Sequence, residues 1–559
     1  MKKFLCLFVM MLLLPAGSAP GAVATVSFQN GANGYNGTFE RKIDDRASTD
    51  PNQEFDGSTV AAYFVDGYQS GTSVSNDGQA LLRFDGLFGS GPGQIPAGAF
   101  IVDAQLRIST GVAGNSQSAG PWGIARLSQP FNSSTSYYTS FPCASCGIGS
   151  RGPWWQDGYS ARPVAGFGGQ WQGAVDSANV RSIVQDWANG SPNDGLVIQT
   201  GFGTSTTVTS GTTDGWGINA TGHPLVDLRP KLTVTYSTSP IEVNTFQHEL
   251  NGYTSDTMAW LQSGPTIFGT AANPDPSIDD VTTDGATLDQ VFLDGPQFSD
   301  PLGNTSSPDD MALVKFGSVF GSGANQAPSD VPVAKAWLVM TTGDASQNAP
   351  SNGDWSVHRL LRSWDATSKY SGFGTTPGLQ VLDGDVAAAA DTVEGMISGS
   401  EVWFDVTSYL EGVRNGAADF GLAVLSTSTA DGWQVHFNGS ATASARPRLV
   451  VASGVLSTVS PGLAGDYNGD SIVNAADYSV WRDHLGLVGG ATASQGDGDG
   501  DGDVDNLDYT VWKSNYGMSG PFGAGAVAGN SQAVPEPTAW LTVCLGLALV
   551  ATYGRSCRA

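Results

Sequence analysis

Residues 102–108 read Val102-Asp103-Ala104-Gln105-Leu106-Arg107-Ile108, and apolar and polar side chains alternate along them. Successive side chains of a strand point to opposite faces of a sheet, so this alternation predicts one buried face and one wet face. Leu232-Thr233-Val234-Thr235-Tyr236 repeats the pattern further along the chain. Gly and Pro are abundant, at 74 and 29 of 559 residues, and charged residues make up only 14%. This composition favours a mainly β protein with many turns over a helical bundle.

The chain contains an internal repeat. Ala80-Leu81-Leu82-Arg83-Phe84 returns as Ala312-Leu313-Val314-Lys315-Phe316, and other blocks return in the same order with loops of different length between them. We place repeat one at residues 25–238 and repeat two at residues 241–453. Each repeat has the size of a whole domain and is much longer than the unit of a solenoid. The sequence therefore predicts two tandem β domains.

Two further features match between the repeats. Trp122 corresponds to Trp355 and Trp216 to Trp433, and positions filled by Trp in both copies are expected to be core positions. In repeat one the period changes locally to that of a helix, with apolar residues at i, i+3, i+4 and i+7 before a glycine. These residues are Val180, Ile183, Val184 and Trp187 before Gly190, and in repeat two they are Val406, Tyr409, Leu410 and Val413 before Gly416.

These framework residues resemble a known family. The segments ALLRFDGL (80–87), VDAQLRI (102–108) and RPKLTVTY (229–236) are similar to the DNRLRE domain, and the second copy is similar to it too. That domain is related to a family of carbohydrate-binding modules, and the resemblance implies two tandem β-sandwiches of jelly-roll type. Both copies depart from the family by long insertions, such as Phe131–Val175 and Trp260–Asp289.

A sugar-binding face needs exposed aromatic rings for stacking and polar groups for the hydroxyls. The insertion of repeat one is rich in aromatic residues, and we take Trp154, Trp155 and Trp171 as candidate contacts to a polysaccharide. The alternative is that a long, glycine-rich insertion uses its large rings to build a small core of its own. The sequence leaves both interpretations open.

Two loops of twelve residues in the C-terminal part carry oxygen-bearing groups at alternate positions. Ca²⁺ is a hard cation that takes six to eight oxygen ligands, and EF-hand-like loops supply them from positions 1, 3, 5, 7, 9 and 12, with a backbone carbonyl at position 7. In loop one these residues are Asp466, Asn468, Asp470, Ile472, Asn474 and Asp477. In loop two they are Asp497, Asp499, Asp501, Asp503, Asp505 and Asp508.

The same five-residue motif follows each loop: Asp477-Tyr478-Ser479-Val480-Trp481 and Asp508-Tyr509-Thr510-Val511-Trp512. Its aromatic residues are expected to pack two helices together. Paired loop–helix units with Asp at position 12 resemble a type I dockerin over residues 465–517. The resemblance implies a cohesin-like protein partner and membership in polysaccharide-degrading assemblies. Positions 10 and 11 here are Ala475-Ala476 and Asn506-Leu507, where cellulosomal dockerins often carry a Ser/Thr pair, so the module could instead be a calcium-stabilised spacer.

Both ends of the chain indicate export. Lys2, Lys3 and the apolar run Phe4–Leu14 predict a signal peptide over residues 1–24. The far end, residues 534–559, resembles a PEP-CTERM sorting tail, with the motif Pro535, Glu536 and Pro537 before a short hydrophobic helix and a basic end. That resemblance implies an exosortase-type processing enzyme, and the alternative is a membrane anchor. Residues 454–464 and 518–533 are expected to be linkers.

The two cysteines of the body, Cys143 and Cys146, are candidates for a local disulfide in an oxidising compartment. The net charge of −27 argues against nucleic-acid binding, which needs clustered Lys and Arg. No catalytic motif stands out. Asp44-Asp45 are adjacent carboxylates, and as strand neighbours they are expected to face opposite sides of a sheet.

Together these features predict a secreted protein of the cell surface or envelope, non-catalytic, that binds extracellular polysaccharide through its β repeats and Ca²⁺ through its dockerin-like module. The first alternative is a structural or adhesive envelope protein without a sugar ligand. The second is a polysaccharide lyase, a glycoside hydrolase or a component of such an assembly.

Overall fold

The computed structural model describes residues 23–48, 51–66, 77–91, 93–118, 120–142, 152–200, 215–262, 281–293, 310–323, 325–344, 350–351, 353–365, 368, 372–373, 379, 381, 383–426, 432–456, 465–468, 472–488, 491, 493–498 and 503–518. The chain divides into two compact units, Met1–Thr458 (unit 1) and Val459–Ala559 (unit 2). Several predicted features lie outside the described residues: the leader up to residue 22, Cys143, Cys146, Asp470, Asp499, Asp501 and the sorting motif Pro535-Glu536-Pro537 with the hydrophobic stretch after it. Among the described helices, none is both long enough and apolar enough to cross a membrane.

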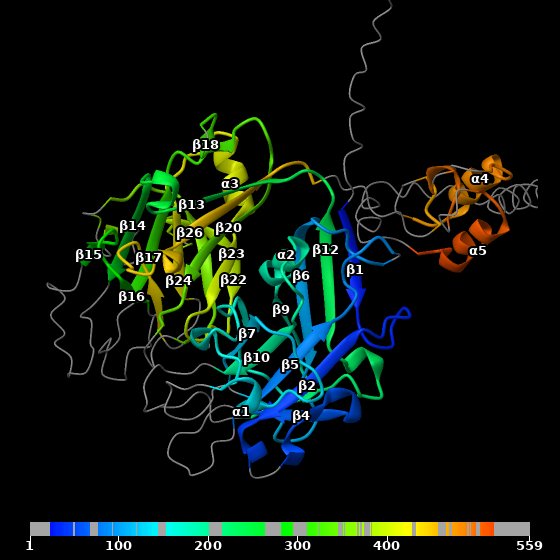
Figure 1. Cartoon of the computed structure of the whole chain (residues 1–559). Coiled ribbons are helices and arrows are strands. Elements are labelled where there is room, and N and C mark those ends of the chain that lie inside the picture. The colour runs from blue at the N-terminus through cyan, green and yellow to red at the C-terminus, as the bar shows by residue number, and fades with distance from the viewer. Residues whose placement is uncertain are drawn as a thin grey trace, which may run out of the picture. The chain divides into compact units, whose positions relative to one another are not determined.

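Unit 1 is mainly β (Figure 1). Within its described residues, repeat one contains a smaller sheet of four strands, a larger sheet of six strands and a separate strand pair. The smaller sheet has the order β1 (Val23–Phe28), β12 (Lys231–Ser237), β6 (Phe100–Ser109), β9 (Val175–Asn179). The larger sheet has the order β3 (Phe55–Asp56), β2 (Thr38–Asp44), β5 (Gly78–Phe84), β10 (Leu196–Thr200), β7 (Trp122–Arg126), β8 (Ala165–Phe167), and the pair is β11 (Trp216–Asn219) with β4 (Ala62–Val65).

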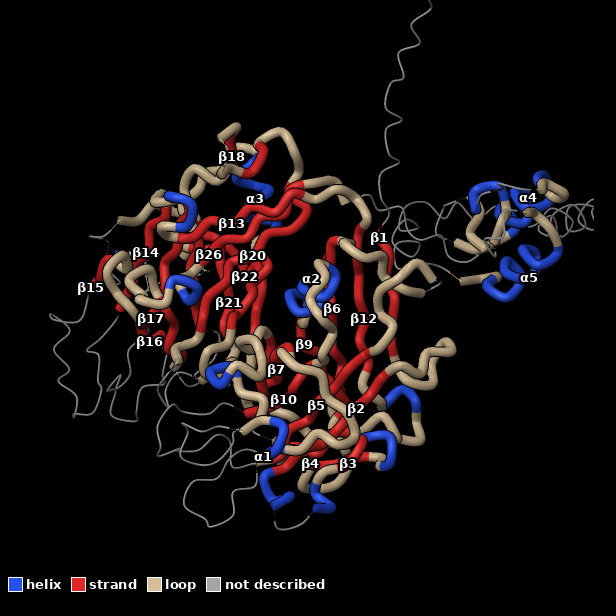
Figure 2. Tube along the Cα trace, in the orientation of Figure 1, coloured by secondary structure: helices blue, strands red, loops and turns tan. Residues whose placement is uncertain are grey.

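Repeat two has the same arrangement in its described residues, so the internal repeat is present in the structure (Figure 2). Its smaller sheet has the order β13 (Glu242–Gln247), β26 (Arg448–Ser453), β20 (Val333–Thr341), β23 (Glu401–Asp405). Its larger sheet has the order β15 (Val281–Asp284), β14 (Asp256–Gln262), β17 (Asp310–Phe316), β24 (Leu422–Ser426), β21 (Trp355–Leu360), β22 (Val386–Val393). The strand pairs are β16 (Gln290–Leu293) with β25 (Trp433–His436) and β18 (Phe320–Gly321) with β19 (Ala327–Pro328).

The core of each repeat lies between its two sheets. In β6 the side chains of Ala104, Leu106 and Ile108 are buried and the polar residues between them are half-buried, as the alternation predicts. They share one cluster with residues of the larger sheet such as Leu82 and Ile198, so the two sheets face each other, consistent with a β-sandwich.

The four matched tryptophans lie in these cores, which confirms that prediction. Trp122 and Trp216 are fully buried with ring centroids 5.6 Å apart, and Trp355 and Trp433 repeat the contact at 5.3 Å. The indole N–H of Trp216 donates to Thr110 Oγ1, so the buried ring also satisfies its polar atom. Because the pair is duplicated, it belongs to the framework of the repeat and not to a ligand site.

The predicted short helices are also present. Helix α2 (Arg181–Ala188) buries Ile183, Val184 and Trp187 and lies beside β6 (Figure 1). Helix α3 (Thr407–Arg414) buries Tyr409 and Leu410 and contacts β20. Each helix covers an apolar patch of its own repeat with one apolar face.

The outer face of the larger sheet of repeat one is also buried, which strand alternation alone does not predict. Leu81 on β5 and Val197 on β10 point away from the main core, and large rings from the insertion cover them. These rings are Phe131, Tyr137 and Phe141, and Tyr137 begins the short helix α1 (Tyr137–Ser140). The insertion therefore builds a small core of its own, as the second interpretation of its aromatic residues predicted.

The described residues of unit 2 include two α-helices of equal length, α4 (Ala475–His484) and α5 (Asn506–Asn515). Each begins inside a predicted calcium loop, at position 10. Trp481 is buried, and its ring lies 5.1 Å from that of Tyr509, while the rings of Tyr478 and Trp512 are 5.2 Å apart. The repeated aromatic phrase therefore packs α4 and α5 together, as expected.

Candidate functional site

The two loop–helix junctions of unit 2 share one hydrogen-bond pattern. At position 9 of loop one, the side chain of Asn474 accepts from the backbone N–H of Ala476 at 2.7 Å, and Asp477 Oδ2 accepts from the N–H of Asn474 at 2.8 Å. In loop two, Asp505 accepts from Leu507 N–H at 2.7 Å, and Asp508 Oδ2 accepts from Asp505 N–H at 2.6 Å. Both helices therefore begin with a reciprocal capping box, which fixes the direction of the position-12 carboxylates.

The position-12 carboxylates reach back to the start of their own loops. Asp477 Oδ1 accepts from the backbone N–H groups of Tyr467 and Asn468, at 2.9 and 3.0 Å. Asp508 Oδ1 accepts from Gly498 N–H at 2.7 Å. Asp477 and Asp508 are almost fully buried, and the position-1 residues Asp466 and Asp497 are each 6% exposed. Each loop thus closes on itself through a buried carboxylate.

The two loops also clamp each other in a reciprocal way. The indole N–H of Trp481 on α4 donates to the carbonyl of Asp505 in loop two at 2.7 Å, and the indole N–H of Trp512 on α5 donates to the carbonyl of Asn474 in loop one at 2.8 Å. The backbone N–H of Val473 pairs with the carbonyl of Met518, and Val504 pairs with Leu487 in the same way, both at 2.9 Å. These matched contacts give unit 2 an internal two-fold relation between its loop–helix halves.

The donor set of the described loop residues fits a hard cation. Asp466, Asp477, Asp497 and Asp508 supply buried carboxylates and Ile472 a backbone carbonyl, with oxygen as the donor atom throughout. Ca²⁺ prefers such ligands, whereas softer metals take Cys sulfur or His nitrogen. Among the residues that the structure describes, no group of three or more His, Cys, Asp or Glu side chains is close enough to hold a metal, and Asp470, Asp499 and Asp501 lie outside that part of the chain.

The three tryptophans predicted to contact sugar lie in different surroundings. Trp154 is 1% exposed and packs against Ile397 of repeat two, so it presents no open ring face. Trp155 is half-buried, and the guanidinium of Arg162 lies 4.1 Å from its ring centroid. Trp171 is 74% exposed and is the one of the three with a ring open for stacking. The structure brings Trp154 and Trp155 together at the contact between the repeats and leaves Trp171 apart.

Sequence reasoning missed a cluster of carboxylates at the end of β2. Asp44 closes the strand and Asp45 opens a 3₁₀ turn (Asp45–Ser48), so the expectation that these neighbours face opposite sides of a sheet is wrong. Both are buried, and Asp77 lies beside them, fully buried, accepting from the hydroxyl of Tyr137. No local pattern could reveal this, because Asp77 and Tyr137 are 60 residues apart.

The carboxylates of this cluster have divergent acidities. Burial would raise the pKa of Asp44, but Arg46 and Lys42 outweigh it and hold the pKa below the ordinary value. Burial, with the nearby charge of Asp44, raises the pKa of Asp45 to about 7. Burial also raises the pKa of Asp77 well above its usual range. The cluster therefore combines a carboxylate whose pKa is lowered by its cations, one with a pKa of about 7, and one whose pKa is raised by burial.

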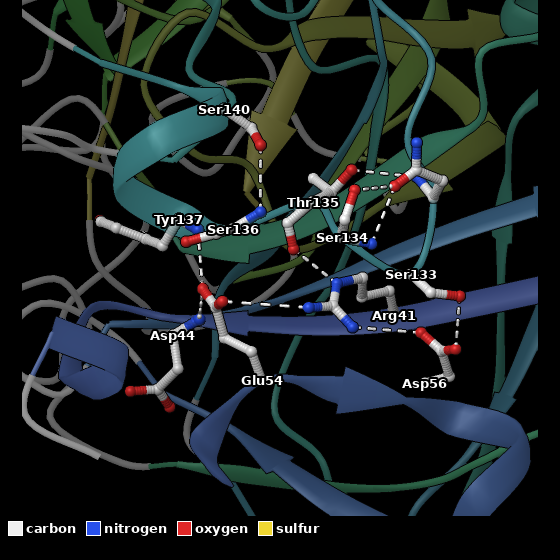
Figure 3. Close-up of polar contacts among 11 residues, drawn as sticks. Arg41, Asp44, Glu54, Asp56, Ser133, Ser134, Thr135, Ser136, Tyr137 and Ser140 are labelled. Carbon is white, nitrogen blue, oxygen red and sulfur yellow. Dashed lines mark hydrogen bonds and ion pairs between the residues drawn. The ribbon is translucent and has the colours of Figure 1, made fainter. Parts of the chain in front are cut away.

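Next to this cluster, a polar network fastens the insertion to the larger sheet (Figure 3). Arg41 on β2 pairs with Asp56 at 3.1 Å, and Ser133 of the insertion donates to the other oxygen of Asp56 at 2.7 Å. Glu54 accepts from the backbone N–H of Tyr137 at 2.7 Å. Because the network fixes the first turn of α1, it also fixes the Tyr137 hydroxyl against Asp77.

No protein-family model and no curated protein matches this chain. Among solved structures the chain is similar to a recombinant N-glycanase F (PNGase F), with 7% identity, a TM-score of 0.20 and coverage of 72% of this chain and 97% of that one. It is also similar to allantoicase from Saccharomyces cerevisiae, with 9% identity, a TM-score of 0.16 and coverage of 67% and 77%. With TM-scores this low, neither likeness bears on what this chain binds or does.

Proposed function

We propose that this chain is an exported, surface-associated, non-catalytic protein that binds Ca²⁺ through residues 465–517 and extracellular polysaccharide through its two β repeats. The observation that supports it most is the duplicated loop–helix half of unit 2, with buried Asp residues at positions 1 and 12 of both loops. Burying several carboxylates in so small a unit is costly unless a cation neutralises them.

In this proposal each loop holds Ca²⁺ through its own oxygens at positions 1, 3, 5, 7, 9 and 12. Bound Ca²⁺ would supply positive charge to the buried carboxylates and cross-link each loop to the start of its helix. The capping boxes and the indole clamps already order α4 and α5 around the loops. We infer that unit 2 is a dockerin-like module whose fold depends on Ca²⁺ and whose exposed surface is available to a cohesin-like protein.

The remaining parts of the proposal rest on the sequence resemblances. The facing sheets of each repeat support the expectation of two jelly-roll-type sandwiches related to carbohydrate-binding modules. The signal peptide and the PEP-CTERM-like tail indicate export and processing by an exosortase-type enzyme. The signal peptide, the sorting tail and the carbohydrate-binding-module-like sandwiches are all consistent with a protein displayed at the cell surface next to extracellular polysaccharide.

The calcium half is tested by titrating Ca²⁺ into the EDTA-treated full-length chain while following helical circular dichroism and calorimetric heat. We expect binding with a gain of helix, and a separate thermal transition for unit 2 that moves to higher temperature with Ca²⁺ concentration. The double variant Asp477→Asn, Asp508→Asn should lose the heat and the shift, whereas Asp483→Asn, on the exposed side of α4, should keep both. Identical unfolding of the wild-type chain in EDTA and in Ca²⁺ refutes this half.

The polysaccharide half is tested by retention on immobilised neutral and acidic glycans, with release of new reducing or unsaturated ends followed in parallel. Retention without release supports a binding protein, and release supports the enzyme alternative. Trp171→Ala should weaken retention if its open ring stacks on sugar, and Leu225→Ala, another exposed apolar residue of repeat one, serves as the control. Absence of both retention and release on every glycan favours a structural envelope protein.

A further inference from the structure

A cleft of about 810 Å³ lies between the two repeats of unit 1. We call it the inter-repeat cleft and define it by residues from both repeats: Phe100, Arg126, Arg162 and Arg181 from repeat one, and Glu401, Trp403 and Arg448 from repeat two. Its volume falls in the range of about 300–1,000 Å³ that is usual for ligand sites. Because both repeats line it, the site does not exist in either repeat alone.

The inter-repeat cleft has the opposite charge to the rest of the chain. Arginines outnumber acids among its lining residues by four to two, the acids being Asp186 and Glu401. The whole chain has 25 basic and 52 acidic residues, so acids predominate about twofold elsewhere. A local reversal of charge in a cavity marks a surface that attracts anions and excludes cations.

Three of the four arginines have a carboxylate partner. Arg162 Nη1 lies 2.8 Å from Asp344, and Arg448 Nη2 lies 2.7 Å from Glu401. Arg126 is more loosely paired, with Nε 3.4 Å from Asp186. Burial raises the pKa of Asp186, and Arg126 only partly opposes that change. Asp186 is therefore a less firmly ionised carboxylate than an exposed aspartate.

Arg181 differs from the other three. It is 7% exposed, its Nε donates to the carbonyl of Ile101 at 2.7 Å, and its guanidinium lies 3.8 Å from the ring centroid of Trp337. No ion pair joins it to any carboxylate in the described residues, and Asp103, Asp186 and Asp405 act on it only from a distance. Burial lowers the pKa of Arg181 to about 10, against the opposing effect of the more distant acids.

Trp403 adds a second group without a partner. Its ring is half-buried on β23 under the guanidinium of Arg448, 5.4 Å from the ring centroid. Its indole N–H is buried and meets no acceptor among the described residues. A guanidinium without a carboxylate partner, in one cavity with an aromatic ring, suits a ligand that carries both anionic oxygens and a sugar-like apolar face.

We propose that the inter-repeat cleft binds an anionic sugar residue of an extracellular polysaccharide, through a carboxylate or sulfate ester that pairs with Arg181 and Arg126. This inference rests on the polysaccharide-binding half of the proposed function and names its site and ligand class. Guanidinium groups suit this task, since their planar donor fork matches the two oxygens of a carboxylate or sulfate. The neutral side chains of Gln185 and Asn189 also line the cleft.

The test uses the full-length chain with Ca²⁺ present and pairs of probes that share a backbone. Oligogalacturonate is compared with its methyl ester, and dextran sulfate with dextran, by isothermal calorimetry. We expect one or both anionic members to bind at least tenfold more tightly than their neutral partners, with affinity falling as NaCl is added. Inorganic sulfate as a competitor shows whether a free anion is sufficient.

Arg181→Gln and Arg126→Gln should each weaken binding of the anionic probe by about tenfold or more, the effect of losing one charge-assisted contact. Arg181→Lys retains the charge and should lie between wild type and Arg181→Gln. Arg107→Gln, on β6 outside the cleft, should bind like wild type. Arg126→Gln keeps the test decisive if Arg181→Gln fails to fold.

Three results overturn the inference. The first is equal affinity for anionic and neutral partners, which leaves the sugar-binding function standing without this site. The second is wild-type affinity in both cleft variants. The third is the absence of binding by any glycan, which removes the polysaccharide half of the proposed function as well.

Discussion

Asp45→Asn is expected to stabilise unit 1 at pH 8 and to flatten its pH dependence. Asp45 is buried beside the ionised Asp44, and burial with that charge raises its pKa to about 7. Above this pH the fold must bury two neighbouring negative charges, and Lys42 and Arg46, each 2.7 Å from Asp44, offset the charge of that residue. Asparagine has the shape of the aspartic acid and cannot ionise.

The sign follows from proton linkage. The folded state holds the Asp45 proton more tightly than the unfolded chain, so between pH 4 and pH 7 only the unfolded chain releases it. The free energy of unfolding therefore falls as the pH rises through this window and levels off above pH 7. The change from the ordinary pKa of 3.8 to about 7 sets a ceiling of about 4 kcal/mol. Arg46 is 31% exposed, so water reaches one side of the cluster, and screening reduces the expected effect to about 1–2 kcal/mol.

The assay is urea unfolding of the full-length chain at pH 5, 6, 7 and 8, with Ca²⁺ held constant and tryptophan fluorescence as the signal. Asp45→Asn should exceed wild type by a margin that is small at pH 5 and reaches its full size by pH 8. Asp85→Asn is the matched control, because Asp85 is a half-exposed carboxylate paired with Arg83 and should leave the profile unchanged. Parallel pH profiles of wild type and Asp45→Asn, or a loss of stability in Asp45→Asn at pH 8, refute the reasoning.

Three further predictions concern packing and hydrogen bonds. Trp216→Ala should lower the free energy of unfolding by about 3–5 kcal/mol because the ring is fully buried in the core, whereas Trp171→Ala, 74% exposed, should change it by less than about 0.5 kcal/mol in the same urea titration. Tyr137→Phe should cost about 1–3 kcal/mol at pH 6, since it leaves the buried Asp77 acid without its hydroxyl donor, and chemical denaturation at that pH measures the loss. Trp481→Phe should lower the melting temperature of Ca²⁺-loaded unit 2 in calorimetry by several degrees, because it removes the indole donor that clamps loop two.

The framework of unit 1 could be predicted from the sequence because its signals are local and are present twice. Alternation over residues 102–108 gave a strand with the expected buried face, and the spacing of Ile183, Val184 and Trp187 gave α2. The repeat then distinguished the shared core residues from those found in one copy only, since Trp122 and Trp355 occupy the same core position. The aromatic phrases after the two loops predicted the packing of α4 and α5 on the same grounds.

What the sequence could not predict depends on contacts between distant segments. Trp154 lies in an insertion where an exposed sugar-binding ring was plausible, but Ile397 of repeat two buries it. The arginines of the inter-repeat cleft are spread over 322 positions, from Arg126 to Arg448, and share no spacing that marks a site. The carboxylate cluster of Asp44, Asp45 and Asp77 could not be predicted either. It depends on the 3₁₀ turn that begins at Asp45, whereas the alternation argument assumed that Asp45 continues the strand.

The carboxylate cluster is a property of repeat one and not of the shared framework, because repeat two builds the same strand without it. β2 pairs with β5 from Thr38 opposite Phe84, and β14 pairs with β17 from Asp256 opposite Phe316, so the two strands are in register residue by residue. In that register the charged residues of β2 are equivalent to apolar or neutral residues of β14. Glu40 corresponds to Met258, Arg41 to Ala259, Lys42 to Trp260 and Asp44 to Gln262.

Met258 and Ala259 are as deeply buried as the charged residues they replace, so an apolar strand satisfies the fold at this place. Buried ion pairs rarely stabilise a fold more than apolar residues of similar size. The charges of β2 are therefore not explained by the stability of the sheet. Arg41 helps to position the insertion, together with Glu54 and Asp56, and this network places the Tyr137 hydroxyl on Asp77, so its effect is to give repeat one a polar attachment for its insertion, one that the apolar equivalent strand of repeat two does not supply.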